Sequence, residues 1–202
     1  MRIGVIGGTF NPVHYGHLIA GMEVKEKMSL KKIIFIPSAL PPHKGLKNLA
    51  GAKDRLAMVR VALKNNPYFS VSALEIDRGG KSYSVETIKA LKELYGKRAE
   101  IFFILGVDAV KEIFTWKRVD EFLSLCRLIV LSRPGYSWRG PGKRLGRTSY
   151  IQITPIGISS SLIRERIKEG KSISFLLPER VEDYIRRHHL YKCGNEIPPL
   201  RG

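Results

Sequence analysis

Cysteine, acidic residues and long hydrophobic runs are all scarce in this chain of 202 residues. The two cysteines, Cys126 and Cys193, are too few for a disulfide framework, and neither belongs to a closely spaced metal-binding pair. Cys126 lies among apolar residues, so we interpret it as a small core residue. No apolar stretch approaches the roughly 20 residues that cross a bilayer, and we expect no membrane partner. The N-terminal segment lacks the pattern of a signal peptide, which favours a cytoplasmic location.

The shortage of acid makes the chain strongly basic. Only 18 Asp and Glu stand against 35 Lys and Arg, a net charge of +17, which attracts polyanions. Nucleic acid must therefore be considered, although the chain has no zinc-finger spacing and no aromatic strand of the RNA-recognition type. We favour small anionic ligands and regard nucleic acid as an unlikely partner. A basic nucleic-acid-binding module on an α/β scaffold is the alternative from another functional class.

Short apolar runs alternate with segments of helical spacing along the whole chain. The runs predict strands at residues 2–6, 33–36, 69–74, 100–105, 127–131 and 150–153. Helices are predicted at 16–28, 52–65, 85–95, 109–125 (with a break), 161–169 and 178–189. This alternation predicts an α/β fold, Rossmann-like and doubly wound, with a mostly parallel sheet, helices on both faces and a C-terminal helical segment. We expect a single domain over residues 1–192 and a loose tail over 193–202.

A candidate phosphate site directly follows the first predicted strand. Residues 7–18 are Gly-Gly-Thr-Phe-Asn-Pro-Val-His-Tyr-Gly-His-Leu. Glycines let backbone N–H groups approach a phosphate, and the N-terminus of the following helix favours an anion. His14 and His17 add donors, and positive charge if they are protonated. As metal ligands they would stand one turn apart, but no further ligand has the spacing to complete a site.

A second candidate anion site precedes the helix predicted at 161–169. Ser159, Ser160 and Ser161 bring hydroxyl groups to the start of this helix, and Arg164 follows in its first turn. A simpler alternative is that Ser159 or Ser161 only caps the helix and that Arg164 is a surface charge.

Together, the two segments resemble the signature of the nucleotidylyltransferase superfamily, whose nucleotide-binding core is His-x-Gly-His. Five further segments are similar to those of bacterial nicotinate-nucleotide adenylyltransferases: Pro41-Pro42-His43-Lys44, Ser82-Tyr83-Ser84, Gly106-Val107-Asp108, Trp116 and Arg133-Pro134-Gly135. The resemblance implies that the 5′-phosphate of nicotinate mononucleotide attacks the α-phosphorus of ATP. The products would be deamido-NAD and pyrophosphate. Mg²⁺ would be the cofactor, carried by the ATP phosphates rather than by a metal site of the protein.

The resemblance also implies three sets of site residues. The catalytic residues would be His14, His17 and Arg164. The ATP-binding residues would be Gly7, Gly8, Thr9, Phe10, His14, His17, Gly106, Asp108, Ile158, Ser159, Ser160, Ser161 and Arg164. The residues that bind nicotinate mononucleotide would be Thr9, Ser38, His43, Lys44, Ser84, Trp116 and Arg133.

Several of these residues also have a plain structural interpretation. Lys44 could be a solvated loop lysine, and Trp116 a core aromatic. Asp108 and Ser84 could each cap the helix that follows them. For Arg55, which no part of the resemblance uses, the favoured interpretation is a surface residue of an amphipathic helix.

The implied mechanism is positioning, because nucleophile and leaving group are phosphate oxygens that are already ionised. His17 would contact the α-phosphate, while His14 and Arg164 hold the β- and γ-phosphates. Two residues depart from the family pattern: Asn11 replaces the common Asp, and Ser84 the common Thr. A pantetheine-phosphate adenylyltransferase or a cytidylyltransferase is the alternative within the superfamily. The sequence leaves open the preference between nicotinate and nicotinamide mononucleotides, and the oligomeric state, a homo-oligomer included.

Overall fold

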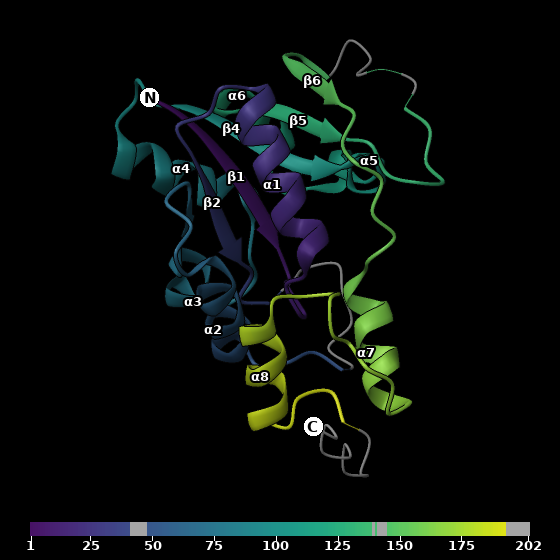
Figure 1. The fold of residues 1–202 in the computed structure, drawn as a ribbon. Coiled ribbons are helices and arrows are strands. Elements are labelled where there is room, and N and C mark those ends of the chain that lie inside the picture. Colours follow the sequence, from purple (N-terminus) through teal and green to yellow (C-terminus); the bar gives the residue numbers. More distant parts are fainter. Residues whose placement is uncertain (41–47, 139, 141–144, 193–202) are drawn as a thin grey trace.

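The structure is a computed structural model that describes residues 1–40, 48–138, 140 and 145–192. Six parallel strands form one sheet in the order β3-β2-β1-β4-β5-β6 (Figure 1). The strands are β1 (Arg2–Gly8), β2 (Lys32–Pro37), β3 (Phe69–Val71), β4 (Glu100–Gly106), β5 (Arg127–Leu131) and β6 (Thr148–Ile151). The strand order reverses between β1 and β4, and ligands of such sheets bind at this switch point, beyond the carboxyl ends of the strands.

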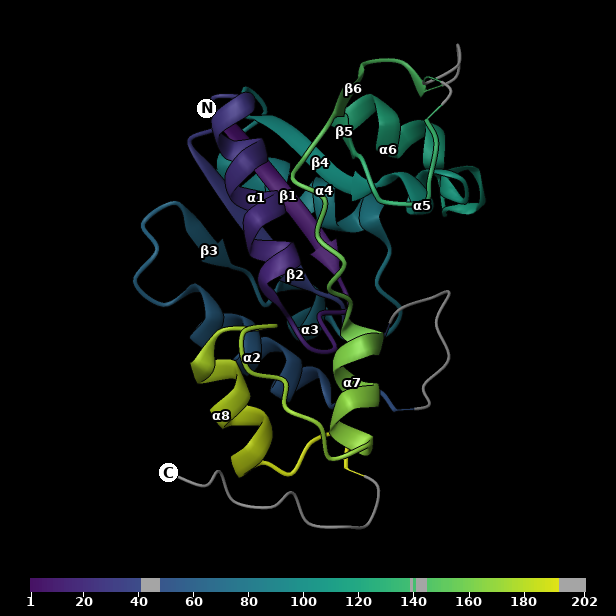
Figure 2. The same cartoon turned by 45° about the vertical axis from the view of Figure 1, so that its right-hand side comes forward.

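Helices connect these strands. They are α1 (Tyr15–Lys27), α2 (Ala52–Leu63), α3 (Leu74–Arg78), α4 (Ser84–Tyr95), α5 (Val107–Val110), the 3₁₀ helix η1 (Ile113–Thr115), α6 (Val119–Leu125), α7 (Ser160–Lys168) and α8 (Glu179–Arg187). Figures 1 and 2 show α1 across one face of the sheet, with α7 and α8 below the end of β1. The predicted α/β architecture with a C-terminal helical segment is confirmed.

Alternate residues of the central strands enter two separate cores. Ile6 of β1 and Ile104 of β4 pack in the core that includes residues of α1, α2, α7 and α8. Val5 and Phe103 point the other way, into the core that includes residues of α4, α5 and α6. Since successive side chains of a strand leave opposite faces, this alternation covers both faces of the sheet. Cys126 is buried in the second core as predicted, and burial raises the pKa of its thiol to about 12.

The largest differences from the sequence-based expectation concern β3, the helix expected at 109–125 and β6. The strand expected at 69–74 ends at Val71, and Leu74 begins α3, a helix that the sequence analysis does not predict. Its buried Glu75 accepts a hydrogen bond from the Thr87 hydroxyl (2.6 Å). The helix expected at 109–125 is divided into α5, η1 and α6, as the predicted break suggests. The last strand lies at Thr148–Ile151, earlier than expected. The proposed tail, 193–202, lies outside the described residues.

Two side chains of α1 fix the linker that leads from β6 to α7. The Glu23 carboxylate accepts a hydrogen bond from the backbone N–H of Thr154 (2.9 Å), and Lys27 donates to the carbonyl of Gln152 (2.7 Å). Hydrogen bonds from Lys27 and Thr154 lower the pKa of Glu23 to about 2, so this contact persists well into the acidic range. The linker therefore carries α7 from the far edge of the sheet back to the end of β1.

A close approach in the centre of the sheet explains Gly4. A Cβ atom there would lie 2.5 Å from Cδ1 of Ile33, 2.9 Å from Cδ1 of Leu30 and 3.0 Å from Cδ1 of Ile104. We expect Gly4→Ala to lower the free energy of unfolding by about 1–3 kcal/mol through overpacking. Ile33→Val removes the closest methyl group and by itself costs about 1 kcal/mol. In urea denaturation the double variant should be less destabilised than the sum of the single variants, and strict additivity would contradict this contact.

Candidate active site

A cavity of about 540 Å³ opens at the switch point of the sheet. Its walls come from the loop between β1 and α1, the end of β4, the segment after β5 and the start of α7. The residues of both candidate anion sites line it, namely Gly7, Gly8, Thr9, Phe10, His14, His17, Ile158, Ser159, Ser160, Ser161 and Arg164, together with Gly106 and Asp108. The structure thus brings together all the residues predicted to bind ATP.

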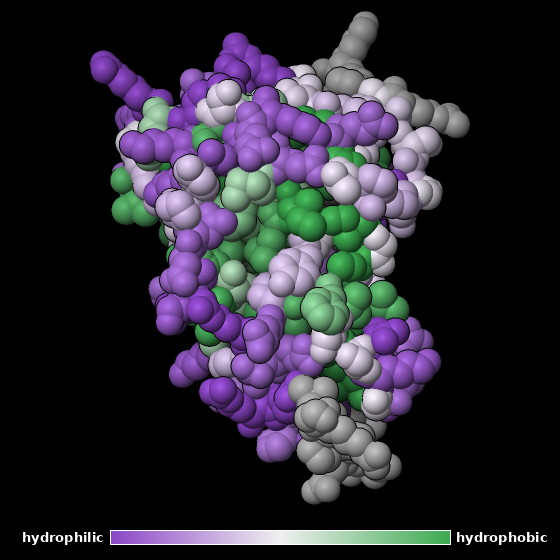
Figure 3. Space-filling model, viewed as in Figure 1, coloured by the Kyte–Doolittle hydropathy of each residue, from purple (hydrophilic) through white to green (hydrophobic). Residues whose placement is uncertain are grey.

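The same cavity has an apolar part. Ile6, Ile104 and Leu131 line it from β1, β4 and β5. On the face of the molecule that Figure 1 shows, hydrophobic residues gather near the centre, and hydrophilic residues surround them (Figure 3). Apolar walls beside a few polar groups are typical of sites for small ligands, so the cavity offers both an apolar surface and phosphate-binding donors.

The loop between β1 and α1 is held by contacts to its carbonyl groups. The backbone N–H of Ser38, after β2, donates to the carbonyl of Gly8 (2.9 Å). From α7, the Ser160 hydroxyl donates to the carbonyl of Pro12 (2.8 Å) and Arg164 to that of Asn11 (2.7 Å). These three hydrogen bonds tie the loop to the segment after β2 and to α7.

Phe10 anchors the same loop from inside. Its φ of 47° is in the left-handed region, and its side chain is buried. The ring packs edge-on against His17, with a centroid distance of 5.1 Å, and against Phe35 at 5.8 Å. Phe10 therefore connects the loop to the rings of His17 and Phe35 by packing.

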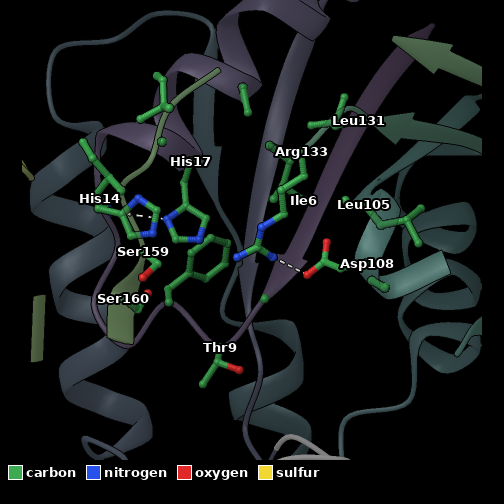
Figure 4. Close-up of a pocket in the computed structure, with 18 of the residues that line it drawn as sticks. Ile6, Thr9, His14, His17, Leu105, Asp108, Leu131, Arg133, Ser159 and Ser160 are labelled. Carbon is green, nitrogen blue, oxygen red and sulfur yellow. Dashed lines mark hydrogen bonds and ion pairs between the residues drawn. The ribbon is translucent and has the colours of Figure 1, made fainter. Parts of the chain in front are cut away.

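His14 and His17 lie side by side at the start of α1, with ring centroids 3.8 Å apart (Figure 4). The backbone N–H of His14 donates to Nδ1 of His17 (3.3 Å). A neutral His17 must then carry its proton on Nε2, which makes that atom a hydrogen-bond donor.

His14 is uncharged at neutral pH. Its side chain is 6% exposed, and burial, helped by the positive charge of Arg133, lowers its pKa from 6.5 to about 4. The backbone N–H of His17 donates to the backbone carbonyl of His14 (2.9 Å) and not to its ring. Among the described residues, the buried Nδ1 of His14 has no hydrogen-bond partner. His14 therefore does not carry at neutral pH the positive charge considered from sequence, and its side chain can act only through hydrogen bonds.

Ser159 and Ser161, at the start of α7, have distinct roles. Ser159 is the N-cap of α7 and accepts a hydrogen bond from the backbone N–H of Leu162 (3.1 Å), as the simpler interpretation predicts. Arg164 bonds to Asn11 and also to the Ser161 hydroxyl (3.2 Å). The alternative that Arg164 is only a surface charge is therefore wrong, because Arg164 joins α7 to the loop between β1 and α1. We call this loop, residues 9–14, the phosphate loop.

A second cavity of about 220 Å³ adjoins the first and shares Gly7, Gly8 and Thr9 with it. Ser38, Ser84 and Trp116 line this second cavity. The Trp116 ring packs edge-on against Phe103, at a centroid distance of 5.9 Å, so it is a core aromatic that also faces the cavity. Ser84 is the first residue of α4 and does not cap it, because Tyr83 is the N-cap.

Comparison with known proteins agrees with this geometry. A family model described as cytidylyltransferase-like matches residues 5–166. A protein of Thermoanaerobacter sp. (strain X514) named "Probable nicotinate-nucleotide adenylyltransferase" is 42% identical over 97% of both chains. A protein of the same name from Desulfitobacterium hafniense (strain Y51) is 45% identical over 95% of this chain and 96% of its own. The chain belongs to the nicotinate-nucleotide adenylyltransferase family.

Solved structures show the same fold. The nicotinic acid mononucleotide adenylyltransferase of Plasmodium falciparum, complexed with NaAD, is 21% identical and has a TM-score of 0.80, covering 94% of this chain and 97% of that chain. The same enzyme complexed with APC has a TM-score of 0.78 at 20% identity, with 94% and 96% covered. Across the described residues, no helix is long and apolar enough to cross a membrane.

Arg133 lies differently from the expectation based on the family. The resemblance assigns it to nicotinate mononucleotide, but it lines the first cavity and forms an ion pair there with Asp108 (Figure 4). Asp108 lies within α5 instead of capping it, since Gly106 is the N-cap. His43 and Lys44, also expected to bind the mononucleotide, lie outside the described residues.

Asn11, where the family often has Asp, is buried, and its side-chain amide forms three hydrogen bonds within the protein. Its buried Oδ1 accepts hydrogen bonds from the N–H of Ala50 (3.0 Å) and the Tyr191 hydroxyl (2.8 Å), and its Nδ2 donates to the carbonyl of Asn48 (2.9 Å). A carboxylate could not make the third bond, because it has no N–H to donate. The amide thus joins the phosphate loop to the end of the described chain.

Sequence reasoning missed Arg55. Its side chain is 1% exposed, so the interpretation as a surface residue is wrong. Arg55 stands one helical turn before Val59, a buried residue of the same stripe, and this spacing is the signal that could have placed it inside.

The carboxylates and histidines of the described residues do not gather into a metal-binding cluster. No group of three or more His, Cys, Asp or Glu within them could hold a metal ion. Asp108 is the one carboxylate among the residues that line the first cavity, and it is paired with Arg133.

The lowered pKa of His14 predicts a specific pH dependence of stability. Between pH 6.5 and about 4 the unfolded chain binds a proton at His14 that the folded chain does not, so stability falls as the pH falls. Urea denaturation should show that acidification from pH 7 to 4 costs the wild type about 3 kcal/mol more than it costs His14→Asn. Equal losses in both proteins would show that His14 titrates normally.

Proposed function

We propose that this chain transfers the adenylyl group of ATP to nicotinate mononucleotide, which yields deamido-NAD and pyrophosphate. The observation that carries the proposal is the pair of adjoining cavities with the phosphate loop between them. Relatives that are 42% and 45% identical over almost the whole chain are named for this activity. A solved structural neighbour is complexed with NaAD, the same dinucleotide product.

In this proposal ATP occupies the first cavity and the mononucleotide the second. Thr9 lines both cavities, at the place where the α-phosphate and the attacking 5′-phosphate would meet. Ser84 and Trp116 would contact the pyridine carboxylate and ring. Because Arg133 lines the first cavity, we assign it to the triphosphate rather than to the mononucleotide.

The protein then accelerates the reaction by alignment. The attacking phosphate is already ionised, so no general base is required, and holding two reactants in line can lower the barrier by about 7–11 kcal/mol. His17 would donate a hydrogen bond to the α-phosphate through Nε2. Neutral His14 and cationic Arg164 would hold the β- and γ-phosphates. Mg²⁺, bound through the triphosphate, would neutralise charge on the leaving pyrophosphate.

An acceptor assay tests the proposal directly. Release of pyrophosphate from ATP is measured with nicotinate mononucleotide, nicotinamide mononucleotide, pantetheine phosphate or no acceptor. We expect the highest kcat/KM with nicotinate mononucleotide. Equal kcat/KM with nicotinamide mononucleotide would refute the preference for nicotinate mononucleotide. Pyrophosphate release with pantetheine phosphate alone would show that the chain is a pantetheine-phosphate adenylyltransferase instead.

The excess of positive charge needs its own control. A nucleic-acid-binding module would bind duplex or single-stranded nucleic acid with a steep dependence on salt, and saturating ATP would not compete. We expect ATP to abolish any such binding, because the charge serves the nucleotide cavity.

The cytoplasmic location remains a prediction.

His17→Ala separates catalysis from binding. If His17 acts on the transition state, kcat should fall by about 10²–10³-fold, as for the loss of one donor to developing charge. The dissociation constant of ATP, measured by calorimetry, should change much less. His17→Asn, which keeps a side-chain N–H donor, should recover part of the loss. An unchanged kcat in His17→Ala would refute this role.

A further inference from the structure

Arg55 of α2 is a buried guanidinium that no part of the proposed mechanism uses. It lines neither cavity, and none of the described carboxylates forms an ion pair with it. Burial lowers its pKa. Because an unpaired buried charge is costly, its hydrogen bonds must offset that cost for the residue to be tolerated.

Each nitrogen of the guanidinium serves a different segment. Nη1 donates to the carbonyl of Thr9 (2.8 Å), Nη2 to that of Ala39 (2.8 Å) and Nε to that of Ala50 (3.0 Å). Thr9 belongs to the phosphate loop, Ala39 follows β2, and Ala50 precedes α2. Since the guanidinium is planar and rigid, it fixes the distances between three segments that are far apart in the sequence.

Two of these segments form walls of the proposed substrate sites. Thr9 lines both cavities, and Ser38, next to Ala39, lines the second. The peptide of Ala50 is held from its other side as well, because its N–H donates to Oδ1 of Asn11. Arg55 thus supports the phosphate loop at Thr9 directly and at Asn11 through Ala50.

We propose that Arg55 is a positioning residue, which holds the phosphate loop and the segment after β2 at the separation that aligns the two substrates. The inference rests on the proposed function, because alignment matters only if both cavities hold reactants. Arg55 touches neither reactant, so its effect passes through Thr9 and Ala39. Small displacements of reacting groups cost far more in kcat than in binding, since each substrate keeps most of its own contacts.

Three variants distinguish positioning from simple stabilisation. Arg55→Lys keeps the charge but has a single nitrogen, which cannot bridge three carbonyl groups in a fixed plane. Arg55→Met keeps much of the volume and removes every donor. Leu63→Ala is the matched control, because Leu63 is buried in α2 two turns from Arg55 and lines neither cavity. It should lose stability without moving the loop.

Steady-state kinetics with ATP and nicotinate mononucleotide are measured well below the lowest unfolding midpoint, and amide hydrogen exchange is followed over residues 7–14. In Arg55→Met we expect kcat to fall by about 10–100-fold while both KM values stay within about threefold, as misalignment predicts. Arg55→Lys should recover part of kcat. Exchange over residues 7–14 should accelerate in both Arg55 variants but not in Leu63→Ala, which should keep its kcat.

The outcomes separate the two proposals. A wild-type protein without adenylyl transfer would refute the proposed function, whereas an active wild type with unaltered kcat in both Arg55 variants would refute positioning. An equal loss of kcat in Leu63→Ala would show that Arg55 only stabilises the fold. Failure of both Arg55 variants to fold would also refute the proposal, because positioning requires a folded protein with a displaced loop.

Discussion

The loop between β1 and α1 depends on distant parts of the chain, because the donors to its backbone carbonyl groups come from other elements of the fold. The carbonyls of Gly8, Thr9, Asn11 and Pro12 bond to the N–H of Ser38, to Arg55, to Arg164 and to the Ser160 hydroxyl, respectively. These donors come from the segment after β2, from α2 and from α7. The rest of the fold is arranged so that these elements meet at one loop.

The basic side chains that line the first cavity include a neutral histidine and two arginines. Burial keeps His14 neutral, and the arginines among the described residues that line the cavity are Arg133 and Arg164. Arg133 contributes to the lowered pKa of His14 and is itself paired with Asp108. The ion pair with Asp108 therefore reduces the net positive charge that Arg133 brings to the cavity.

Local pattern was sufficient where the chemistry depends on neighbours in sequence. The glycines at the end of β1, the paired histidines at the start of α1 and the serine cap of α7 were all recognisable because turns and caps use adjacent residues. It was not sufficient for Arg55, whose three partners lie 5, 16 and 46 residues away. Nor could it place Arg133, because the partner of Arg133 is 25 residues distant.

The sequence by itself determined the alternation of strands and helices, the two candidate anion-binding segments and, through its resemblance, the family. Those features follow from periodicity and from contacts within a few residues. The tertiary structure decided which cavity each side chain enters, that His14 is neutral and that Arg55 is buried. Burial and long-range hydrogen bonds depend on elements that meet only when the sheet has formed. The local pattern at Arg55 signals a buried position but does not show its partners.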